Sequence, residues 1–549
     1  MRRAGTLVAV GLLFVLCLAV AVARGQQVPD DVQKKLDAFM KRLDQQDKII
    51  QAQDDKIQKQ DEKIQQQEQL IQSLQKGGAK PAGAPGGAES LTPKQEKKVE
   101  ELVKDYLGKD ENRVSLGLEG VVAGYKDGFF LASRDQAYKI KFTGYVQTDG
   151  RFSDTPTADT FLVRRARPTV EGTLAKYYNF KIQPDFGQGK ATLMDGYLEL
   201  ANFADLSTTR LGKFKVPQGI EYLTTANYIP FVERSLALNI MPQRDVGVMT
   251  YGSPFNGIVD YSFGIWNGDD RTEWQDKSKD SDTDNNKAQD FGGRLQVNPF
   301  KTTKNPWLKG LWAAGWFNYG MEEDTYALGK GKSVLGYNTQ VGTSFFKTYS
   351  GTTGTNAATD IYAVRQDGNR LRAGWDAGWL FGPVKFISEL DVMNTELTRE
   401  VGRGPGNAPI FDSGHIPTMA WYVQTSWLLT GEDAVMKMPK PKKNFDPQKG
   451  TWGAFELAAR YSRLEIGSAM FENHPGELTP TFAAAGSTHR ASDITLGLNW
   501  YLNPNVKLMF DWEHTIFDGD IIVSPTSGIG SKKSLDDEDA FLFRTQIVW

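Results

Sequence analysis

The sequence predicts an all-β transmembrane barrel of about 16 antiparallel strands, preceded by an α-helical coiled-coil segment. Three observations support this fold class. From about Tyr138 onward, polar and apolar residues alternate with a period of two in many short segments. Aromatic residues are abundant enough to form interfacial girdles, with 30 Phe, 19 Tyr and 13 Trp. The chain ends on Trp549, with Ile547, Phe543 and Phe541 on the same face, a pattern typical of the insertion signal of outer-membrane barrels.

Residues 1–23 have the features of a secretory signal peptide. Arg2 and Arg3 precede an apolar run of about 16 residues, and Ala21-Val22-Ala23 forms a small-residue cleavage site. The alternative, a membrane anchor, would need about 20 apolar residues. The only cysteine, Cys17, lies in this run, so we expect no disulfide and no thiolate metal site in the mature chain.

Residues 28–76 are expected to form a self-associating coiled coil. Two strict heptads run through this segment: Leu36, Leu43, Ile50, Ile57, Ile64 and Ile71 at one position, and Phe39, Gln46, Gln53, Gln60, Gln67 and Leu74 three residues later. These two heptads form a coiled-coil seam with apolar residues at the a positions and mostly glutamine at the d positions. Buried glutamines lower the stability of a coiled coil but fix its register and oligomer state. One long solvated helix is the alternative.

Three shorter segments connect the coiled coil to the barrel. Residues 77–91 are rich in Gly, Ala and Pro and are expected to form a flexible linker. Residues 92–108 begin with the helix-capping pair Thr92-Pro93 and carry an apolar stripe, which predicts a short amphipathic helix. Residues 113–137 are expected to form a β-hairpin that leads into the barrel.

Residues 138–549 are assigned to the barrel. In "KIKFTGYVQTDGRF", Lys141 and Arg151 lie on one face of the predicted strand, and Phe142 and Phe152 lie on the other. Dividing about 410 residues among 16 strands leaves about 26 residues for each strand and its connection, and a barrel of this size encloses an aqueous channel. A soluble sandwich, the alternative, would carry an ordinary surface mixture on its polar faces.

The segment "FLVRRARPTVEGTL" carries three arginines within four positions. Strict alternation puts Arg165 and Arg167 on one face and Arg164 on the other. An arginine facing lipid at the bilayer midplane would cost about 2–4 kcal/mol. Arg165 and Arg167 are therefore expected to face a water-filled lumen, and Arg164 to snorkel at the membrane edge.

The segment "GKFKVP" repeats this pattern. Alternation places Lys213 and Lys215 toward the lumen, and Phe214 and Val216 toward lipid. The formal net charge of −3 does not indicate a partner, and inward-facing bases only slightly outnumber inward-facing acids. Anion selectivity would instead have to come from basic residues concentrated at one narrow level of the channel.

Several of these segments resemble the phosphate-selective porin O and P family. The matching stretches extend over roughly residues 124–549 and include "KDGFFLAS", "KFTGYVQTDGRF", "FLVRRARPTVEGTL", "LGKFKVPQGIE", "PQRDVGV" and "WGAFELAARYSRL". The resemblance implies a sixteen-stranded outer-membrane barrel that assembles as a homotrimer and passes anions through a lumen lined with arginine and lysine. Because such porins are commonly trimers, we expect a three-stranded coiled coil, located in the periplasm.

The resemblance, carried over by motif, implies an anion-binding site in the lumen. Its residues are Arg165, Arg167, Lys213, Lys215, Asp185 and Arg460, and alternation adds Arg151. The function expected is passive uptake of inorganic phosphate or related small anions, without enzymatic activity, cofactor or nucleic-acid partner. The remaining partners expected are outer-membrane lipid and the barrel-assembly machinery.

Other functions stay open on the sequence alone. The alternatives are a general diffusion porin, a channel that prefers polyphosphate or pyrophosphate, and a barrel that mainly anchors a coiled coil tethering the envelope. An outer-membrane hydrolase is the enzymatic alternative. However, no G-x-S-x-G motif is present, and His415, His474, His489 and His514 show no zinc-ligand spacing.

Overall fold

The computed structural model describes residues 121–156, 159–202, 207–268, 288–323, 335–349, 364–472, 482–523 and 532–549. The predicted signal peptide, coiled coil, linker and short helix all lie outside the described residues, as does the beginning of the predicted 113–137 hairpin. No helix in the described part of the chain is long and apolar enough to cross a membrane.

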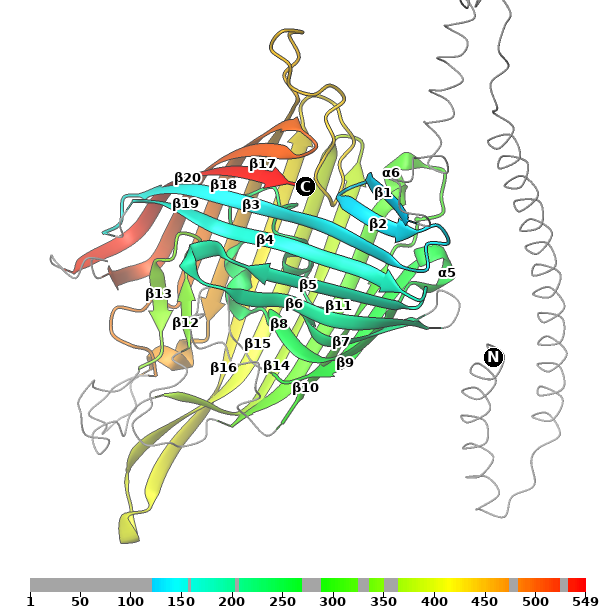
Figure 1. Cartoon of the computed structure of the whole chain (residues 1–549). Coiled ribbons are helices and arrows are strands. Elements are labelled where there is room, and N and C mark those ends of the chain that lie inside the picture. Colours follow the sequence, from blue (N-terminus) through cyan, green and yellow to red (C-terminus); the bar gives the residue numbers. More distant parts are fainter. Residues whose placement is uncertain are drawn as a thin grey trace, which may run out of the picture. The chain divides into compact units, whose positions relative to one another are not determined.

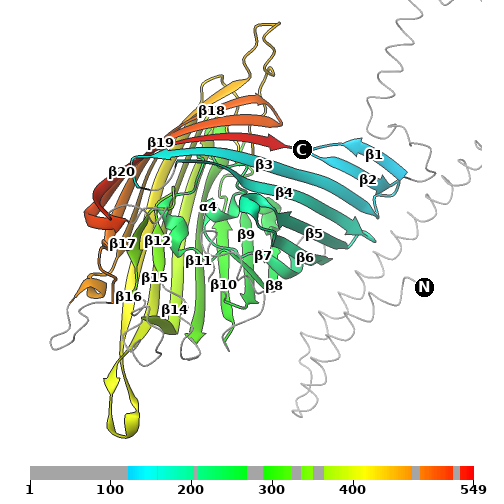
Figure 2. The same ribbon diagram turned by 60° about the vertical axis from the view of Figure 1, so that its left-hand side comes forward.

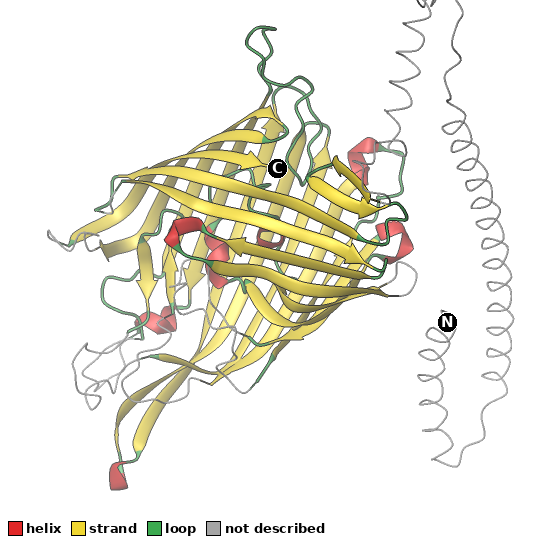
Figure 3. Ribbon diagram, viewed as in Figure 1, coloured by secondary structure: helices red, strands yellow, loops and turns green. Residues whose placement is uncertain are grey.

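Sixteen antiparallel strands close into a barrel, which confirms the barrel part of the predicted fold class (Figures 1 and 3). The strands are β3 (Lys139–Ser153), β4 (Thr160–Leu174), β5 (Tyr178–Asp185), β6 (Thr192–Asn202), β7 (Ser207–Lys215), β8 (Arg244–Gly252), β9 (Val259–Trp266), β10 (Asp290–Val297), β11 (Gly310–Glu323), β14 (Arg365–Phe381), β15 (Val384–Arg403), β16 (Pro409–Leu428), β17 (Ala454–Ile466), β18 (Arg490–Asn503), β19 (Val506–Val523) and β20 (Lys533–Val548). Each pairs with the next, and β20 pairs with β3 to close the ring.

Shorter elements flank or enter the barrel. A hairpin of β1 (Val121–Tyr125) and β2 (Phe129–Ser133) precedes the barrel, and β2 pairs with the start of β3. A second hairpin consists of β12 (Gly336–Asn338) and β13 (Ser344–Lys347). The described helices are short: α4 (Ile220–Leu223), α5 (Pro254–Gly257), α6 (Pro306–Lys309), and 3-10 turns at Gly187–Gly189, Leu236–Ile240, Pro405–Asn407 and Ser468–Phe471.

The outer face of the barrel is apolar, because every second residue of a strand points outward and these outward residues are mostly apolar. On β9, Phe263 and Ile265 are 59% and 57% exposed, whereas the neighbouring Trp266 points inward and is 1% exposed. Such an exterior suits hydrocarbon, and the paired strands satisfy the backbone hydrogen bonds that a bilayer cannot.

A β-bulge in β4 changes which arginines face inward. Gln147 of β3 lies opposite Arg165, but the next residue, Thr148, lies opposite Val163, so Arg164 is the extra residue. Arg164 and Arg165 are both fully buried, and Val163 is exposed on the outer face. The prediction that Arg164 snorkels at the membrane edge is therefore wrong, because the bulge shifts the alternation by one residue.

Residues 216–243, here called the inner segment, connect β7 to β8 and fold into the barrel. Figure 2 shows α4, which belongs to this segment, enclosed by the strands. Side chains of the wall hold its main-chain carbonyls. These carbonyls and their donors are Ala226 with Gln147, Asn227 with Gln546, Ile229 with Lys507, Pro230 with Asn499, Val232 with Arg544, and Glu233 with Arg460. These bonds supply the hydrogen-bond partners that buried carbonyls require.

Apolar side chains fill the interior beside β15 to β19. The ring of Tyr337 stacks on Phe346 at a centroid distance of 5.3 Å, and Phe345 stacks on Phe517 of β19 at 6.2 Å. Together with Phe482, these side chains belong to one buried cluster that includes inward residues of β15 to β19. This part of the interior is therefore a packed core.

Candidate anion passage

Four arginines of the barrel wall converge on the carboxylate of Glu233 in the inner segment. Glu233 Oε1 accepts hydrogen bonds from Arg151 Nη2 at 2.5 Å, Arg164 Nε at 2.7 Å and Arg544 Nη2 at 3.2 Å. Its Oε2 accepts from Arg165 Nη2 at 3.5 Å. All five side chains are buried. Arg151 and Arg165, two of the predicted anion-binding residues, thus hold the inner segment to the wall.

Asp149 contributes a second carboxylate to this cluster. Arg544 donates to its two oxygens at 2.6 and 2.7 Å, and Arg151 donates at 2.9 Å. Burial raises the pKa of Glu233, but the charges of the four arginines, that of Arg164 foremost, outweigh burial and hold this pKa well below its usual range. Glu233 therefore remains ionised, and its negative charge balances part of the positive charge of the buried arginines, which would be costly to bury without a partner.

Arg460 of β17 also holds the inner segment. Its Nη1 donates to the main-chain oxygen of Glu233 at 2.9 Å and lies 3.5 Å from a carboxylate oxygen of Glu221. Its guanidinium lies 4.5 Å from the ring centroid of Phe231. The structure thus places the predicted Arg460 against the inner segment, where its described contacts are structural.

Arg167 and Asp185 form a buried pair within the wall. Arg167 Nε donates to Asp185 Oδ2 at 2.9 Å, and Arg167 Nη1 donates to the Tyr145 hydroxyl at 3.0 Å. Asp185 Oδ1 also accepts from the main-chain N–H groups of Ala166 at 3.1 Å and Gly187 at 2.9 Å. The pair therefore fastens the end of β5 to β4.

The end of β7 departs from the predicted alternation. Phe214 and Val216 are fully buried instead of facing lipid, and Lys215 reaches the interior. The backbone at Gly212 has a φ of 127°, a left-handed conformation that interrupts the regular pleat. Lys213, which was predicted to face the lumen with Lys215, is half-buried and is not among the described residues that line the interior cavity.

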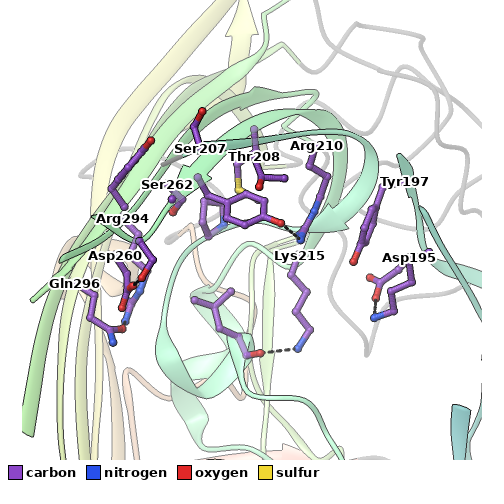
Figure 4. Close-up of a pocket in the computed structure, with 18 of the residues that line it drawn as sticks. Asp195, Tyr197, Ser207, Thr208, Arg210, Lys215, Asp260, Ser262, Arg294 and Gln296 are labelled. Carbon is purple, nitrogen blue, oxygen red and sulfur yellow. Dashed lines mark hydrogen bonds and ion pairs between the residues drawn. The ribbon is translucent and has the colours of Figure 1, made fainter. Parts of the chain in front are cut away.

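A cavity of about 550 Å³ lies beside β5 to β10 and the inner segment (Figure 4). Its lining residues are Lys181, Gln183, Asp195, Tyr197, Ser207, Thr208, Arg210, Lys215, Pro217, Leu223, Thr225, Arg244, Met249, Tyr251, Gly252, Ser253, Asp260, Tyr261, Ser262, Arg294 and Gln296. Basic residues outnumber acidic ones in this lining. Of the seven residues predicted for the anion site, Lys215 is the one that lines this cavity within the described ranges.

A cluster with excess positive charge lies where the cavity meets the inner segment. Lys215 and Arg244 are opposite each other on β7 and β8. Arg244 Nε donates to Asp195 Oδ1 at 2.7 Å, Arg244 Nη1 donates to the Tyr222 hydroxyl at 3.1 Å, and Lys181 Nζ lies 2.8 Å from Asp195 Oδ2. Lys181 and Arg244 therefore share one carboxylate, and Lys215 lies opposite Arg244, so basic side chains outnumber acidic ones at this place.

The two facing cations have different capacities for an anion. Lys215 Nζ donates to the main-chain oxygens of Tyr222, Leu223 and Thr224 at 2.6, 3.2 and 3.3 Å, so its N–H donors are occupied. Arg244 uses its Nε and one Nη1 hydrogen in the contacts above, and a guanidinium has further donors. Lys215 therefore has no N–H group left for an anion, whereas Arg244 can donate hydrogen bonds to one.

Arg210 packs against the rings of two tyrosines that also line the cavity. Its guanidinium lies 4.2 Å from the Tyr197 ring centroid and 5.0 Å from that of Tyr251. Its Nε and Nη2 donate to Glu199 Oε1 at 2.9 and 2.6 Å, and the Tyr251 hydroxyl donates to the same oxygen at 2.6 Å. Figure 4 shows Arg210 and Tyr197 extending into the cavity. Because Glu199 neutralises Arg210, these three side chains present flat surfaces to a solute in the cavity and little net charge.

Sequence reasoning missed the residues that carry most of this geometry. Arg244 lies in "PQRDVGV", one of the segments that carries the family resemblance, so this motif was the available signal. Arg210 precedes "GKFK" on the same strand, but the alternation that was expected to place Lys213 and Lys215 inward would have placed Arg210 on the lipid face, so it gave no signal for this residue. Glu233 lies outside the strands, where period-two alternation gives no information.

The chain matches the family model described as phosphate-selective porin O and P over residues 140–515. No curated protein matches the chain. The match covers most of the barrel, including the wall that lines the cavity.

Solved outer-membrane proteins are similar to the chain at low identity. In vitro folded OmpT of Vibrio cholerae is 12% identical, with 75% of this chain and 98% of that chain covered and a TM-score of 0.43. An anion-selective porin from Comamonas acidovorans is 12% identical, with 75% and 100% covered and a TM-score of 0.43. The channel DcaP of Acinetobacter baumannii is 10% identical, with 78% and 100% covered and a TM-score of 0.40. Similarity at this level does not extend to function.

Proposed function

Because this chain belongs to the phosphate-selective porin O and P family, it is an outer-membrane channel, and we propose that it conducts phosphate and related small anions through the cavity beside β5 to β10. The observation that carries this proposal is a cluster in which Lys181 and Arg244 share the single carboxylate of Asp195 and Lys215 lies opposite Arg244. Concentrated positive charge at one level of a channel attracts anions and raises the barrier for cations.

In the proposed mechanism, Lys215 attracts the anion and Arg244 forms hydrogen bonds with it. Lys215 supplies positive charge without a free N–H group, so an anion near it keeps its water. Arg244 can replace part of that water by donating to two oxygens of a phosphate with its planar guanidinium. Asp195 already holds Arg244 and Lys181, which keeps the binding weak enough for release.

The arginines predicted from the sequence have another role in this proposal. Arg151, Arg165 and Arg460 position the inner segment, and the inner segment provides the carbonyls that hold Lys215. We therefore assign these arginines to the shape of the passage and assign anion attraction to the cavity cluster.

Single-channel recording with Lys215→Gln tests the proposal. A unit charge about 6 Å from a permeating ion contributes about 0.7–2.8 kcal/mol for effective dielectric constants between about 80 and 20. Losing Lys215 should therefore lower the chloride-to-potassium permeability ratio at least about threefold. It should also raise the phosphate concentration that halves the chloride current.

Lys213→Gln is the matched control, because it removes the same charge from the same strand at a position that does not line the cavity. It should leave permeability and phosphate block unchanged. Lys215→Arg should retain selectivity because it retains the charge. Equal permeability ratios in wild-type protein and Lys215→Gln would refute the assignment and favour a general diffusion pore.

We further propose that the protein works as a homotrimer with its coiled coil in the periplasm. The unbroken heptad from Leu36 to Ile71 and the family resemblance support this assembly. Outer-membrane lipid would surround the barrel, and the barrel-assembly machinery would insert it through the C-terminal aromatic pattern. The coiled coil would also suit an envelope tether, as the sequence alternatives allow.

A further inference from the structure

We infer that the cavity beside β5 to β10 recognises organic phosphates with a polyhydroxylated body, such as sugar phosphates, more strongly than it recognises inorganic phosphate. This inference rests on the proposed function, since it names the solute class for the same passage. It is based on three chemically different regions that follow one another along the cavity.

The first region suits a doubly charged head group. Arg244 and Lys181 pair with Asp195, Lys215 lies opposite Arg244, and Arg244 has donors beyond its described contacts. A phosphate monoester carries about 1.5–2 negative charges near neutral pH and offers several acceptor oxygens. A carboxylate would supply less charge to this cluster, so a phosphate ester is the better match.

The second region suits a flat or cyclic body attached to that head group. Tyr197 lies across from Gly212, three residues from Lys215, which is about 10 Å along a strand at about 3.3 Å per residue. The guanidinium of Arg210 packs 4.2 Å from the Tyr197 ring and is neutralised by Glu199. Aromatic rings and guanidinium planes present faces on which the apolar face of a sugar ring can pack.

The third region suits hydroxyl groups. Thr208 and Ser262 lie opposite Tyr251 on the two neighbouring strands, and Ser207 precedes Thr208 in the cavity lining. Figure 4 shows Ser207, Thr208 and Ser262 on the opposite side of Arg210 from Tyr197. Their side chains can both donate and accept hydrogen bonds, as sugar hydroxyls require.

The size of the cavity supports a solute larger than an ion. Its volume is about 550 Å³, and pockets of about 300–1,000 Å³ typically hold organic ligands. Inorganic phosphate at the charged cluster would contact neither Tyr197 nor the hydroxyl-lined end. A sugar phosphate would contact at least two of the three regions at once.

Block of chloride current through the purified full-length protein in a planar bilayer tests this inference. The probes are inorganic phosphate, glucose 6-phosphate and glucose. Glucose 6-phosphate should half-block the current at a concentration at least fivefold below that of inorganic phosphate, and glucose should not block at that concentration. Tyr197→Ala should abolish this difference by weakening the block by glucose 6-phosphate, and Tyr197→Phe should preserve it.

Tyr461→Ala is the matched control, because Tyr461 lies on the outer face of β17, against Trp421. It should preserve the preference. If Tyr197→Ala fails to assemble, Tyr197→Leu gives the same test with a larger apolar side chain. Equal or weaker block by glucose 6-phosphate, equal block by glucose, or a preference that survives loss of the ring would each overturn the inference. If the wild-type channel is anion-selective and is blocked by phosphate but does not prefer glucose 6-phosphate, only this inference is refuted. If the wild-type channel is not anion-selective, the proposed function is refuted as well.

Discussion

Replacing Glu233 with Gln should loosen the inner segment and make the channel current unsteady. Glu233 is buried and accepts hydrogen bonds from four arginines, so the substitution removes the negative charge that pairs them with the inner segment. Removing one partner of a buried ion pair costs about 3–5 kcal/mol. At about 1.4 kcal/mol per factor of ten, this shifts the equilibrium between held and released inner segment by about two to three and a half orders of magnitude.

Single-channel recordings measure this effect directly. Glu233→Gln should show rapid transitions to higher conductance, because a released inner segment no longer narrows the interior. A second measurement uses Ala226→Cys in the same background. The Ala226 side chain is buried and its carbonyl is held by Gln147, so a thiol reagent should label it faster once the inner segment is released.

Asp185→Asn is the matched control for this prediction. Asp185 also pairs with a buried arginine, but its described contacts lie within the wall and do not involve the inner segment. Asp185→Asn should lower thermal stability without adding current transitions or speeding the labelling of Ala226→Cys. If Glu233→Gln and Asp185→Asn behave alike in both measurements, the four-arginine cluster has no special role in holding the inner segment.

Three further predictions concern pH, insertion and assembly. The pKa of Glu233 lies below its ordinary value of about 4.3. The ionised carboxylate therefore contributes its full stability above that pH, and this contribution is lost only as the pH falls through the lowered pKa. The channel current should be equally steady at pH 7 and pH 5, and current transitions that appear between these two values would contradict this. Deleting residues 541–549 removes half of β20 and its pairing with β3, so the truncated protein should lack the heat-modifiable migration of a folded barrel on gels, and normal migration would contradict this. A peptide of residues 28–78 should be helical and trimeric by sedimentation equilibrium, and Asp at Ile50, Ile57 and Ile64 should make it monomeric, whereas a dimer in the unsubstituted peptide would count against the prediction.

The barrel could be predicted from the sequence because its determinants are local. In a membrane barrel each strand has one face on lipid and the other on the interior, so period-two alternation directly reports the fold. The chain length then limits the number of strands, and sixteen is the number observed. The inward positions of Arg165 and Arg167 follow from the same alternation and the cost of placing arginine in lipid.

The tertiary structure decided what those inward side chains contact. The bulge that turns Arg164 inward depends on hydrogen bonding between β3 and β4, which no single-strand pattern reveals. The path of the inner segment depends on wall donors as distant in sequence as Lys507 and Gln546, which lie 278 and 319 residues from the carbonyls they hold. Alternation distinguishes the interior from the lipid face, but it cannot distinguish an arginine bound to Glu233 from one that lines a cavity. That difference arises only when the segment between two strands folds back into the barrel and satisfies the buried charges there.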